Sequence, residues 1–384
     1  MKKLVRSFSR ALIVLSLLLC SSGSVSWAAD AVEIRDKRPD GSANRAAWMG
    51  RGEHGIMVHY LIPPRGKTPQ EKTADLNRIV DNYDVEYFLK QFDQTKADWL
   101  IITLGQTTGY FCAPNEYLDK LAPGHTPRRD LVREIAQGLR KRNKRLILYL
   151  ASGRSRDPIY RNIFKSDNEE TDGQYLDFVR SYAKRYGDLL SGWWFDGCVR
   201  RSDKGWQRWM DAARAGNPQA ALAFSGAEFC CGGPTNPLCA LEDYHAGEIH
   251  LLEDSKIRRD FLPPGGDIVV QNGKLRKRGQ EARTYLPDGQ FIDNVQWHCL
   301  LPIDLTFNPA VPNQFCHYYD YELFEFVERI KSVGGAITIN VPLDRSNGHM
   351  YEDSLAQLAR LGLWMTDKSG KRQPARPGTC WGTD

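Results

Sequence analysis

Two carboxylates close short runs of apolar and aromatic residues. Asp196 ends the run Gly192-Trp-Trp-Phe-Asp196, and Gly197 behind it lets the chain turn sharply. Glu248 ends the segment Glu242-Asp-Tyr-His-Ala-Gly-Glu248. Glycoside hydrolysis requires two carboxyl groups in one pocket: one attacks the sugar or activates water, and the other protonates the leaving oxygen. The pattern therefore predicts glycoside hydrolysis with Asp196 and Glu248 as the catalytic pair.

Other interpretations stay open at this stage. Asp196 is also in place to cap the helix that follows it. Glu242, Asp243 and His298 are alternatives to Glu248 as the acid. The tryptophans Trp193, Trp194 and Trp297 are equally compatible with core packing.

Polar and aromatic residues that could bind a sugar end the other predicted strands. The predicted substrate-binding residues are His59, Tyr60, Gln106, Thr107, Trp194, Asp243, His245, Trp297 and His298. Ser152, Ser225, Glu228 and Asn340 hold similar positions. The cysteine and histidine spacings fit no zinc site, no serine elbow occurs, and no GxGxxG follows the first strand. The sequence thus predicts no metal and no cofactor.

Short apolar runs alternate with amphipathic segments along the chain, as in a parallel α/β fold. Helices are predicted at 84–95, 130–141, 175–186, 206–215, 321–333 and 354–363. Strands are predicted at 54–60, 98–104, 145–150, 192–196, 221–225, 241–245, 294–300 and 335–341. Eight such units fit a closed (β/α)8 barrel, whose active site lies at the carboxyl ends of the strands. The residues named above would then share one mouth.

The chain ends and one long connection are expected to lie outside this barrel. Residues 1–28 resemble a secretory signal peptide, with a basic start, a short apolar run and Ser26-Trp-Ala28 at the cleavage site. We therefore expect export, with lipid attachment at Cys20 as the alternative. Residues 29–47 are a lead-in, 48–365 the barrel, 262–288 an insertion rich in Gly, Pro and basic residues, and 366–384 a tail.

Charge and cysteine content limit the classes of partner. Loss of the four basic signal residues lowers the formal net charge from +5 to +1, which gives no reason to expect nucleic-acid binding. No later segment is apolar for long enough to span a membrane. Eight cysteines remain, and their pairing as disulfides or free thiols cannot be read from the sequence. The expected partner is a carbohydrate, and the oligomeric state is open.

Several of these segments, in order, resemble glycoside hydrolase family 29, the α-L-fucosidases. The first strand, His54-Gly-Ile-Met-Val-His-Tyr60, is similar to the family's opening motif. The Asp196 segment is similar to the one that bears its nucleophile. Asp243-Tyr-His-Ala-Gly-Glu248 is similar to the family's Asp-aromatic-x-x-Pro-Glu, and 334–342 to its last strand. The resemblance covers about residues 48–365. It implies a retaining mechanism, with Asp196 as nucleophile, a second carboxyl group as acid and base, and His59 on a sugar hydroxyl.

The sequence departs from this family at three places. Its Lys-His-His-Asp-Gly-Phe run is here Gly105-Gln-Thr-Thr-Gly-Tyr-Phe111. Its Trp-Glu is here Trp297-His298, and we expect no counterpart of its C-terminal β-sandwich. Two further hypotheses therefore stand beside the fucosidase-like hydrolase. One is a barrel that binds carbohydrate without catalysis, and the other is an inverting hydrolase or a lyase.

Overall fold

The computed structural model describes residues 32–106, 108–152, 157–226, 237–248, 268–271, 274–277, 289–304 and 318–367. All of these residues belong to one compact unit, Ala31–Asp384. The predicted signal peptide, Thr107, Glu228, most of the 262–288 insertion and residues 368–384 of the predicted tail lie outside the described residues.

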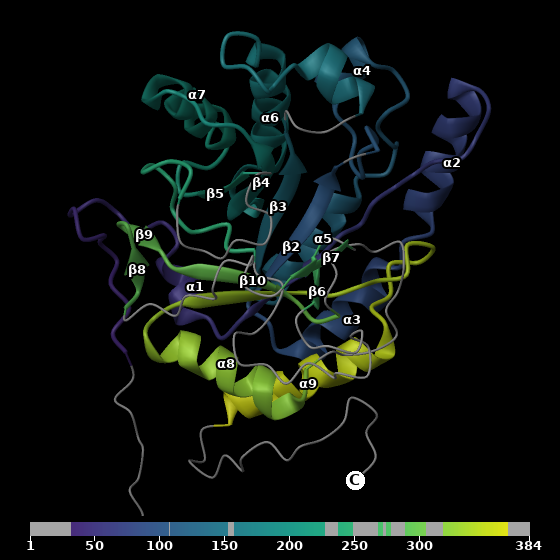
Figure 1. The fold of residues 1–384 in the computed structure, drawn as a ribbon. Helices are drawn as coiled ribbons and strands as arrows, with labels where there is room; N and C mark the ends of the chain where they lie inside the picture. Colours follow the sequence, from purple (N-terminus) through teal and green to yellow (C-terminus); the bar gives the residue numbers. More distant parts are fainter. Residues whose placement is uncertain are drawn as a thin grey trace, which may run out of the picture. The chain divides into compact units, whose positions relative to one another are not determined.

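A parallel sheet of seven strands forms the centre of this unit (Figure 1), in the order β10-β11-β1-β2-β3-β4-β5. The strands are β1 (Gly55–Val58), β2 (Trp99–Gly105), β3 (Arg145–Ala151), β4 (Gly192–Cys198), β5 (Ala221–Gly226), β10 (His298–Pro302) and β11 (Ala336–Asn340). The strand order follows the chain, with β10 and β11 returning to the side of β1, as in a TIM-like barrel. The predicted α/β class is confirmed.

The predicted sixth strand, 241–245, does not form a regular strand. The segment 243–248 instead joins the two edges of the sheet: Asp243 N donates to Leu222 O of β5 (2.9 Å), and Leu300 N of β10 donates to Gly247 O (2.8 Å). Gly247 has φ +69°, and a Cβ there would lie 2.2 Å from His298 O, so the strand conformation is interrupted at this close approach. Of the eight strands predicted for the barrel, seven form the central sheet among the described residues.

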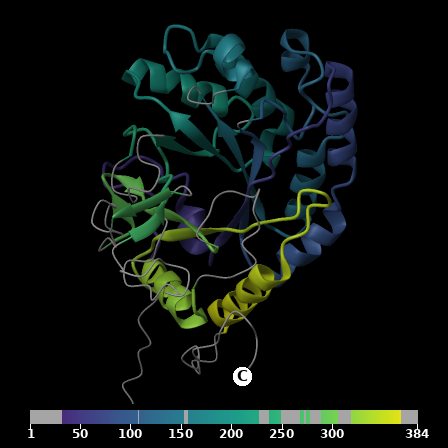
Figure 2. The same cartoon turned by 45° about the vertical axis from the view of Figure 1, so that its right-hand side comes forward.

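Six predicted helices are present with small shifts of their ends. They are α3 (Val85–Thr95), α5 (Leu131–Lys141), α6 (Gly173–Tyr186), α7 (Asp203–Ala213), α8 (Asp320–Ser332) and α9 (Glu352–Thr366). The predicted cap at Asp130 is confirmed, since its side chain accepts from Arg133 N (3.0 Å). In both views α9 lies between α3 and α8 (Figures 1 and 2). None of the helices among the described residues is long and apolar enough to cross a membrane.

Several elements were not predicted from the sequence. They are α1 (Ala47–Arg51), α2 (Pro69–Asp81), α4 (Glu116–Leu121), a π-helical turn (Ile159–Phe164), the hairpin of β6 (Ile268–Gln271) and β7 (Lys274–Lys277), and the hairpin of β8 (Phe291–Ile292) and β9 (Val295–Gln296). α2 begins with a capping box in which Thr68 and Glu71 bond each other's backbone. It adds a helix between β1 and α3, on the chain that leaves the first strand.

Side chains alternate along each strand between two hydrophobic cores, one on each face of the sheet. Ile56, Val58, Leu100 and Leu148 pack with the helices, whereas another set of strand side chains packs on the opposite face of the sheet. This inner set includes Met57, Trp99, Ile101, Ile147, Tyr149, Trp194, Ala223 and Leu300. Successive strand residues point to opposite faces, so position parity decides which core a side chain joins.

A buried ion cluster ties the lead-in to the barrel. The fully buried Asp243 accepts from Arg38 (2.9 Å), from Arg214 and from Leu222 N (2.9 Å), and Arg45 lies 3.6 Å away. The predicted lead-in, residues 29–47, therefore packs against the barrel through Arg38 and Arg45. The carboxylate of Asp243 neutralises arginines that are far apart in the sequence.

We predict that Asp243→Asn lowers the free energy of unfolding by about 3–5 kcal/mol, because the buried Arg38 and the partly buried Arg214 lose their counter-charge. Chemical denaturation monitored by tryptophan fluorescence measures this. The matched control is Asp188→Asn, which removes an exposed pair with Arg140 and is expected to change the free energy of unfolding far less, because water screens the two charges. Equal losses in the two variants would show that the buried cluster has no special role.

Candidate active site

Tyr149 lies at the centre of the polar groups at the carboxyl ends of the strands. It sits opposite Trp194 in the register of β3 and β4, and the two rings stack at 5.0 Å with an interplanar angle of 14°. Its hydroxyl donates to Asp196 Oδ2 (2.5 Å), and the His59 ring meets its edge at 5.2 Å. The stacked tryptophan fixes the ring from below, so the hydroxyl is held against the carboxylate.

Asp196 is half-buried and accepts several hydrogen bonds. Gln106 Nε2 donates to the Oδ2 that Tyr149 also binds (3.4 Å), and Gly197 donates from its backbone. Burial raises the pKa of Asp196, and these three donors oppose that rise by favouring the anion. The turn expected at Gly197 is present, with φ +66°. The alternative role as a helix cap is wrong, because Ser202 caps α7.

Glu248 is the second carboxylate near Tyr149. It is half-buried, its Oε2 accepts from Ser225 Oγ (3.2 Å), and its backbone bridges to Leu300 of β10. Burial, then the Asp196 carboxylate, then the charge of Glu248 raise the pKa of Tyr149. Both carboxylates therefore act on the same phenol, which stays protonated and can donate a hydrogen bond.

His59 and Asn340 complete this side of the site from β1 and β11. The His59 ring is 5 % exposed, and its Nδ1 lies 2.7 Å from Asn340 Oδ1. Burial lowers the pKa of His59 to about 4, so the imidazole is neutral at neutral pH. Because the amide oxygen accepts, the proton sits on Nδ1. His59 is thus a neutral polar side chain beside Tyr149.

The structure does not bring Tyr60 or Trp297 together with Asp196. Both lie in the core between sheet and helices, where the Tyr60 hydroxyl donates to Ile79 O (3.2 Å) and the Trp297 ring packs against Gly335. Trp194 is fully buried beneath Tyr149, and its Nε1 donates to Ala246 O (3.1 Å). Tyr60 and Trp297 point to the helix-facing side of the sheet, whereas Trp194 shares the face of Asp196 but is covered by Tyr149.

Asp243, His245 and His298 also lie apart from Asp196. His298 is the first residue of β10, paired with Ala336, whereas Asn340 pairs with Pro302 at the other end of the strand. The two nitrogens of His298 contact His245 O and Thr338 Oγ1, each at 2.8 Å. Burial lowers the pKa of His298 to about 3. The predicted strand 294–300 placed His298 near the carboxyl end of the strand. In the structure His298 is the first residue of β10 and therefore lies at the amino end.

His245 is held in the same way. Its Nε2 lies 3.2 Å from Ile292 O, and burial lowers its pKa to about 4. Glu242, another alternative acid, is fully buried and accepts from Phe224 N (3.4 Å) and Cys239 N (3.1 Å). Burial raises the pKa of Glu242 well above its usual value. Of the alternatives for the acid, Glu248 is the one whose charge reaches Tyr149.

Sequence reasoning missed Tyr149 as a site residue. It was read as part of an apolar strand, although it shares parity with Ile147 and carries a polar tip toward the strand end. Among the described residues no cluster of His, Cys, Asp and Glu could hold a metal ion. The four described cysteines, Cys112, Cys198, Cys239 and Cys299, are buried free thiols.

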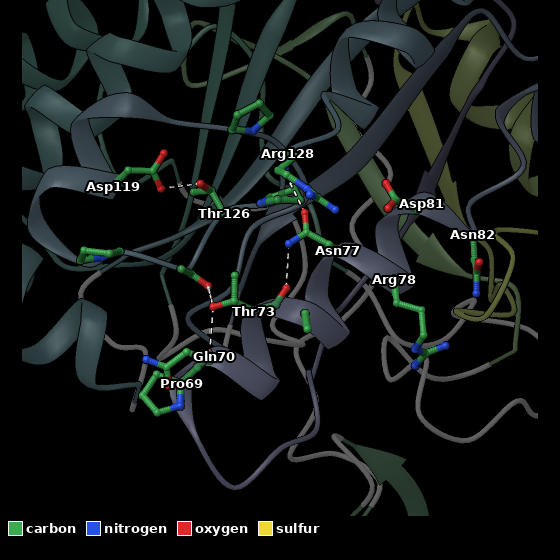
Figure 3. A pocket seen from close by; sticks show the side chains of 15 residues that line it. Pro69, Gln70, Thr73, Asn77, Arg78, Asp81, Asn82, Asp119, Thr126 and Arg128 are labelled. Atoms are coloured by element: carbon green, nitrogen blue, oxygen red, sulfur yellow. Dashed lines mark hydrogen bonds between the residues drawn. The ribbon is translucent and has the colours of Figure 1, made fainter.

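A groove of about 1100 Å³ lies between α2 and the segment 114–128 (Figure 3). Arg128 N donates to Asn77 Oδ1 (2.8 Å) and Thr73 Oγ1 donates to Gly124 O (3.2 Å), which ties its walls together. Those walls belong to the chain segments that follow β1 and β2. Neither Asp196 nor Glu248 lines the groove, so the carboxylate chemistry is located elsewhere.

Comparison with known proteins gives a result at the level of the fold. No family model matches the sequence, and no curated protein matches it. Among solved structures, it is similar to an endo-fucoidan hydrolase from glycoside hydrolase family 107, with TM-score 0.55, 13% identity, and coverage of 85% of this chain and 94% of that one. It is also similar to MfFcnA4 of that family, with TM-score 0.55, 19% identity, and 84% and 53% coverage.

A third similar structure is the α-L-fucosidase AlfC from Lactobacillus casei, with TM-score 0.55, 15% identity, and coverage of 84% of this chain and 97% of that one. At these identities the likeness shows a shared fold alone. It does not single out family 29.

We predict that Tyr149→Phe moves the acid limb of the pH profile of kcat/KM to higher pH. The variant keeps the ring stack with Trp194 but loses a donor that favours the Asp196 anion, so the already raised pKa of Asp196 rises further. Since this profile reports the free enzyme, measuring kcat/KM across pH tests the effect. An unmoved limb, or one displaced to lower pH, would contradict the role given to Tyr149.

Proposed function

We propose that this chain is an exported, α-L-fucosidase-like glycoside hydrolase that cleaves a terminal or internal glycosidic bond by a retaining mechanism. The observation that carries the proposal is the position of Tyr149, which is hydrogen-bonded to Asp196 and also feels the charge of Glu248. Two half-buried carboxylates around one protonated phenol, at the carboxyl ends of parallel strands, suit glycoside hydrolysis.

In this proposal Asp196 is the nucleophile. Its carboxylate oxygen attacks the anomeric carbon, the bond to the leaving oxygen breaks, and a covalent glycosyl-enzyme forms. Glu248 first donates a proton to the leaving oxygen and then takes one from the water that hydrolyses the intermediate. Retaining enzymes place their carboxyl groups about 5–5.5 Å apart.

Tyr149 and Gln106 support the nucleophile in this scheme. Both donate to Asp196 Oδ2, which orients the carboxylate and offsets the cost of burying its charge. The neutral His59 is a suitable hydrogen-bonding partner for a sugar hydroxyl. The choice of an α-L-fucoside rests on the fold that the chain shares with fucose-cleaving hydrolases. Residues 1–28 support the proposed export, because their pattern fits a cleaved signal peptide.

The prediction that tests this function is that Asp196→Asn abolishes release of sugar without unfolding the chain. The amide lacks the nucleophilic charge but keeps the shape of the side chain. Since the folded state raises the pKa of Asp196, it favours the neutral form. The melting temperature of the variant is therefore expected to be unchanged or higher. The measurement combines thermal unfolding with assays on aryl glycosides and on natural fucosylated glycans.

Glu248→Gln is the matched companion variant. Loss of the acid should slow cleavage of natural glycans strongly and spare the first step for aryl glycosides, whose leaving groups need little protonation. Near wild-type activity of Asp196→Asn would sink the nucleophile assignment. Glycan binding by wild type and Asp196→Asn alike, with no turnover of any substrate, would favour the carbohydrate-binding hypothesis instead.

A further inference from the structure

Two buried polar atoms in the neighbourhood of Asp196 have no hydrogen-bond partner among the described residues. They are the hydroxyl of Tyr160 and the Oε1 of Gln106. Buried polar groups are nearly always paired in folded proteins, so each exception needs an explanation. Tyr160 was not identified by sequence reasoning, and the mechanism above uses only the Nε2 of Gln106.

Tyr160 is carried by the π-helical turn Ile159–Phe164, on the chain that leaves β3. Such turns are rare and frequently occur at functional sites. Its fully buried ring packs against Phe164 (5.5 Å) and Phe111 (6.3 Å). Phe111 in turn fills the space beside Gly105, the residue before Gln106. The packing thus fixes Tyr160 near the ends of β2 and β3.

The charges that act on Tyr160 agree with the position that its packing gives it. Burial, then the carboxylates of Asp157 and Asp196, raise its pKa well above the usual value. Tyr160 in turn raises the pKa of Tyr149. Tyr83 also has an unpartnered hydroxyl, but it is influenced by Tyr60, Cys112 and Arg129 and not by Asp196. Tyr160 is therefore an un-ionised donor close to the nucleophile.

The two unpartnered atoms are complementary. Tyr160 can donate a hydrogen bond, whereas Gln106 Oε1 can only accept one because Gln106 Nε2 is the donor to Asp196. A hydroxyl group is the simplest chemical group that accepts from one partner and donates to another. Hydrogen bonds around a catalytic site are often incomplete without substrate and close when it binds.

We propose that Tyr160 and Gln106 form a subsite for one ring hydroxyl of the sugar whose anomeric carbon faces Asp196. This inference rests on the proposed function and adds a specificity-determining residue to it. The hydroxyl accepts from Tyr160 and donates to Gln106 Oε1. A site built around such a hydroxyl rejects an analogue that lacks it, because its buried polar atoms are then left unpaired.

The experiment compares the full chain, Tyr160→Phe and the control Tyr182→Phe. Tyr182 is equally buried, but its hydroxyl donates to Ala113 O (2.8 Å). Each protein is assayed with 4-nitrophenyl α-L-fucoside and with its three analogues that each lack one ring hydroxyl, and thermal unfolding is measured in parallel.

We expect Tyr160→Phe to lower kcat/KM for the parent fucoside about tenfold or more. Its melting temperature should be unchanged or higher, since no native hydrogen bond is lost. For one deoxygenated analogue the wild type and Tyr160→Phe should be equally slow. Tyr182→Phe should show the reverse: a lower melting temperature with the wild-type ranking of the four substrates.

Equal loss of activity by Tyr160→Phe on all four substrates, or no loss at all, would overturn the subsite. If the wild type hydrolyses none of them, the proposed function fails on this sugar, and titration calorimetry with L-fucose decides the inference separately. Weaker binding by Tyr160→Phe than by Tyr182→Phe supports the subsite. Equal binding by the two variants, or no binding by any of the three proteins, overturns it.

Discussion

The alternation of side chains along parallel strands is the constraint on which the site depends. Residues of one parity pack against helices, and those of the other parity line the opposite face. That second set runs from Met57 to His59 on β1, from Ile147 to Tyr149 on β3, and from Trp194 to Asp196 on β4. Because Tyr149 pairs with Trp194 and Ala151 with Asp196, the phenol and the carboxylate meet at the strand ends. A shift of register by one residue would send both into the helix-facing core.

Buried polar groups at the two ends of the strands differ in their partners and in the side chains near them. At the amino ends, both ring nitrogens of His298 and the carboxylate of Asp243 have protein partners, whereas Nε of Arg38 and both ring nitrogens of His54 have none among the described residues. At the carboxyl ends, Asp196 and Glu248 are half-buried, while Tyr160 and Gln106 keep unpartnered atoms. Unpartnered atoms therefore occur at both ends of the strands, and those of Tyr160 and Gln106 are distinguished by the half-buried carboxylate of Asp196 near them.

Much of the fold could be predicted from the sequence, because strand and helix periodicity are local signals. α2 was not predicted, although Thr68, Pro69 and Glu71 form a recognisable capping box. The predicted sixth strand does not form, because Gly247 approaches β10 too closely. The candidate site was harder to predict than the fold. Asp196, Glu248, His59 and Gln106 were found from their places after apolar runs. Tyr60 and Trp297 were misplaced because neighbouring residues along a strand point to opposite faces, and His298 because β10 begins four residues after the start of the predicted strand 294–300. Tyr149 and Tyr160 required the structure, since partners from several strands define them.

In the proposed mechanism Asp196 forms a covalent bond to the sugar. The most direct measurement is intact-protein and peptide mass spectrometry after incubation with 2-deoxy-2-fluoro-α-L-fucosyl fluoride, in which the fluorine at carbon 2 slows hydrolysis of the intermediate and the fluoride leaves readily. The account predicts the mass of one fluorosugar on the peptide that contains Asp196, and no label in Asp196→Asn. A label on another carboxylate, or turnover with inversion at the anomeric carbon, would contradict it.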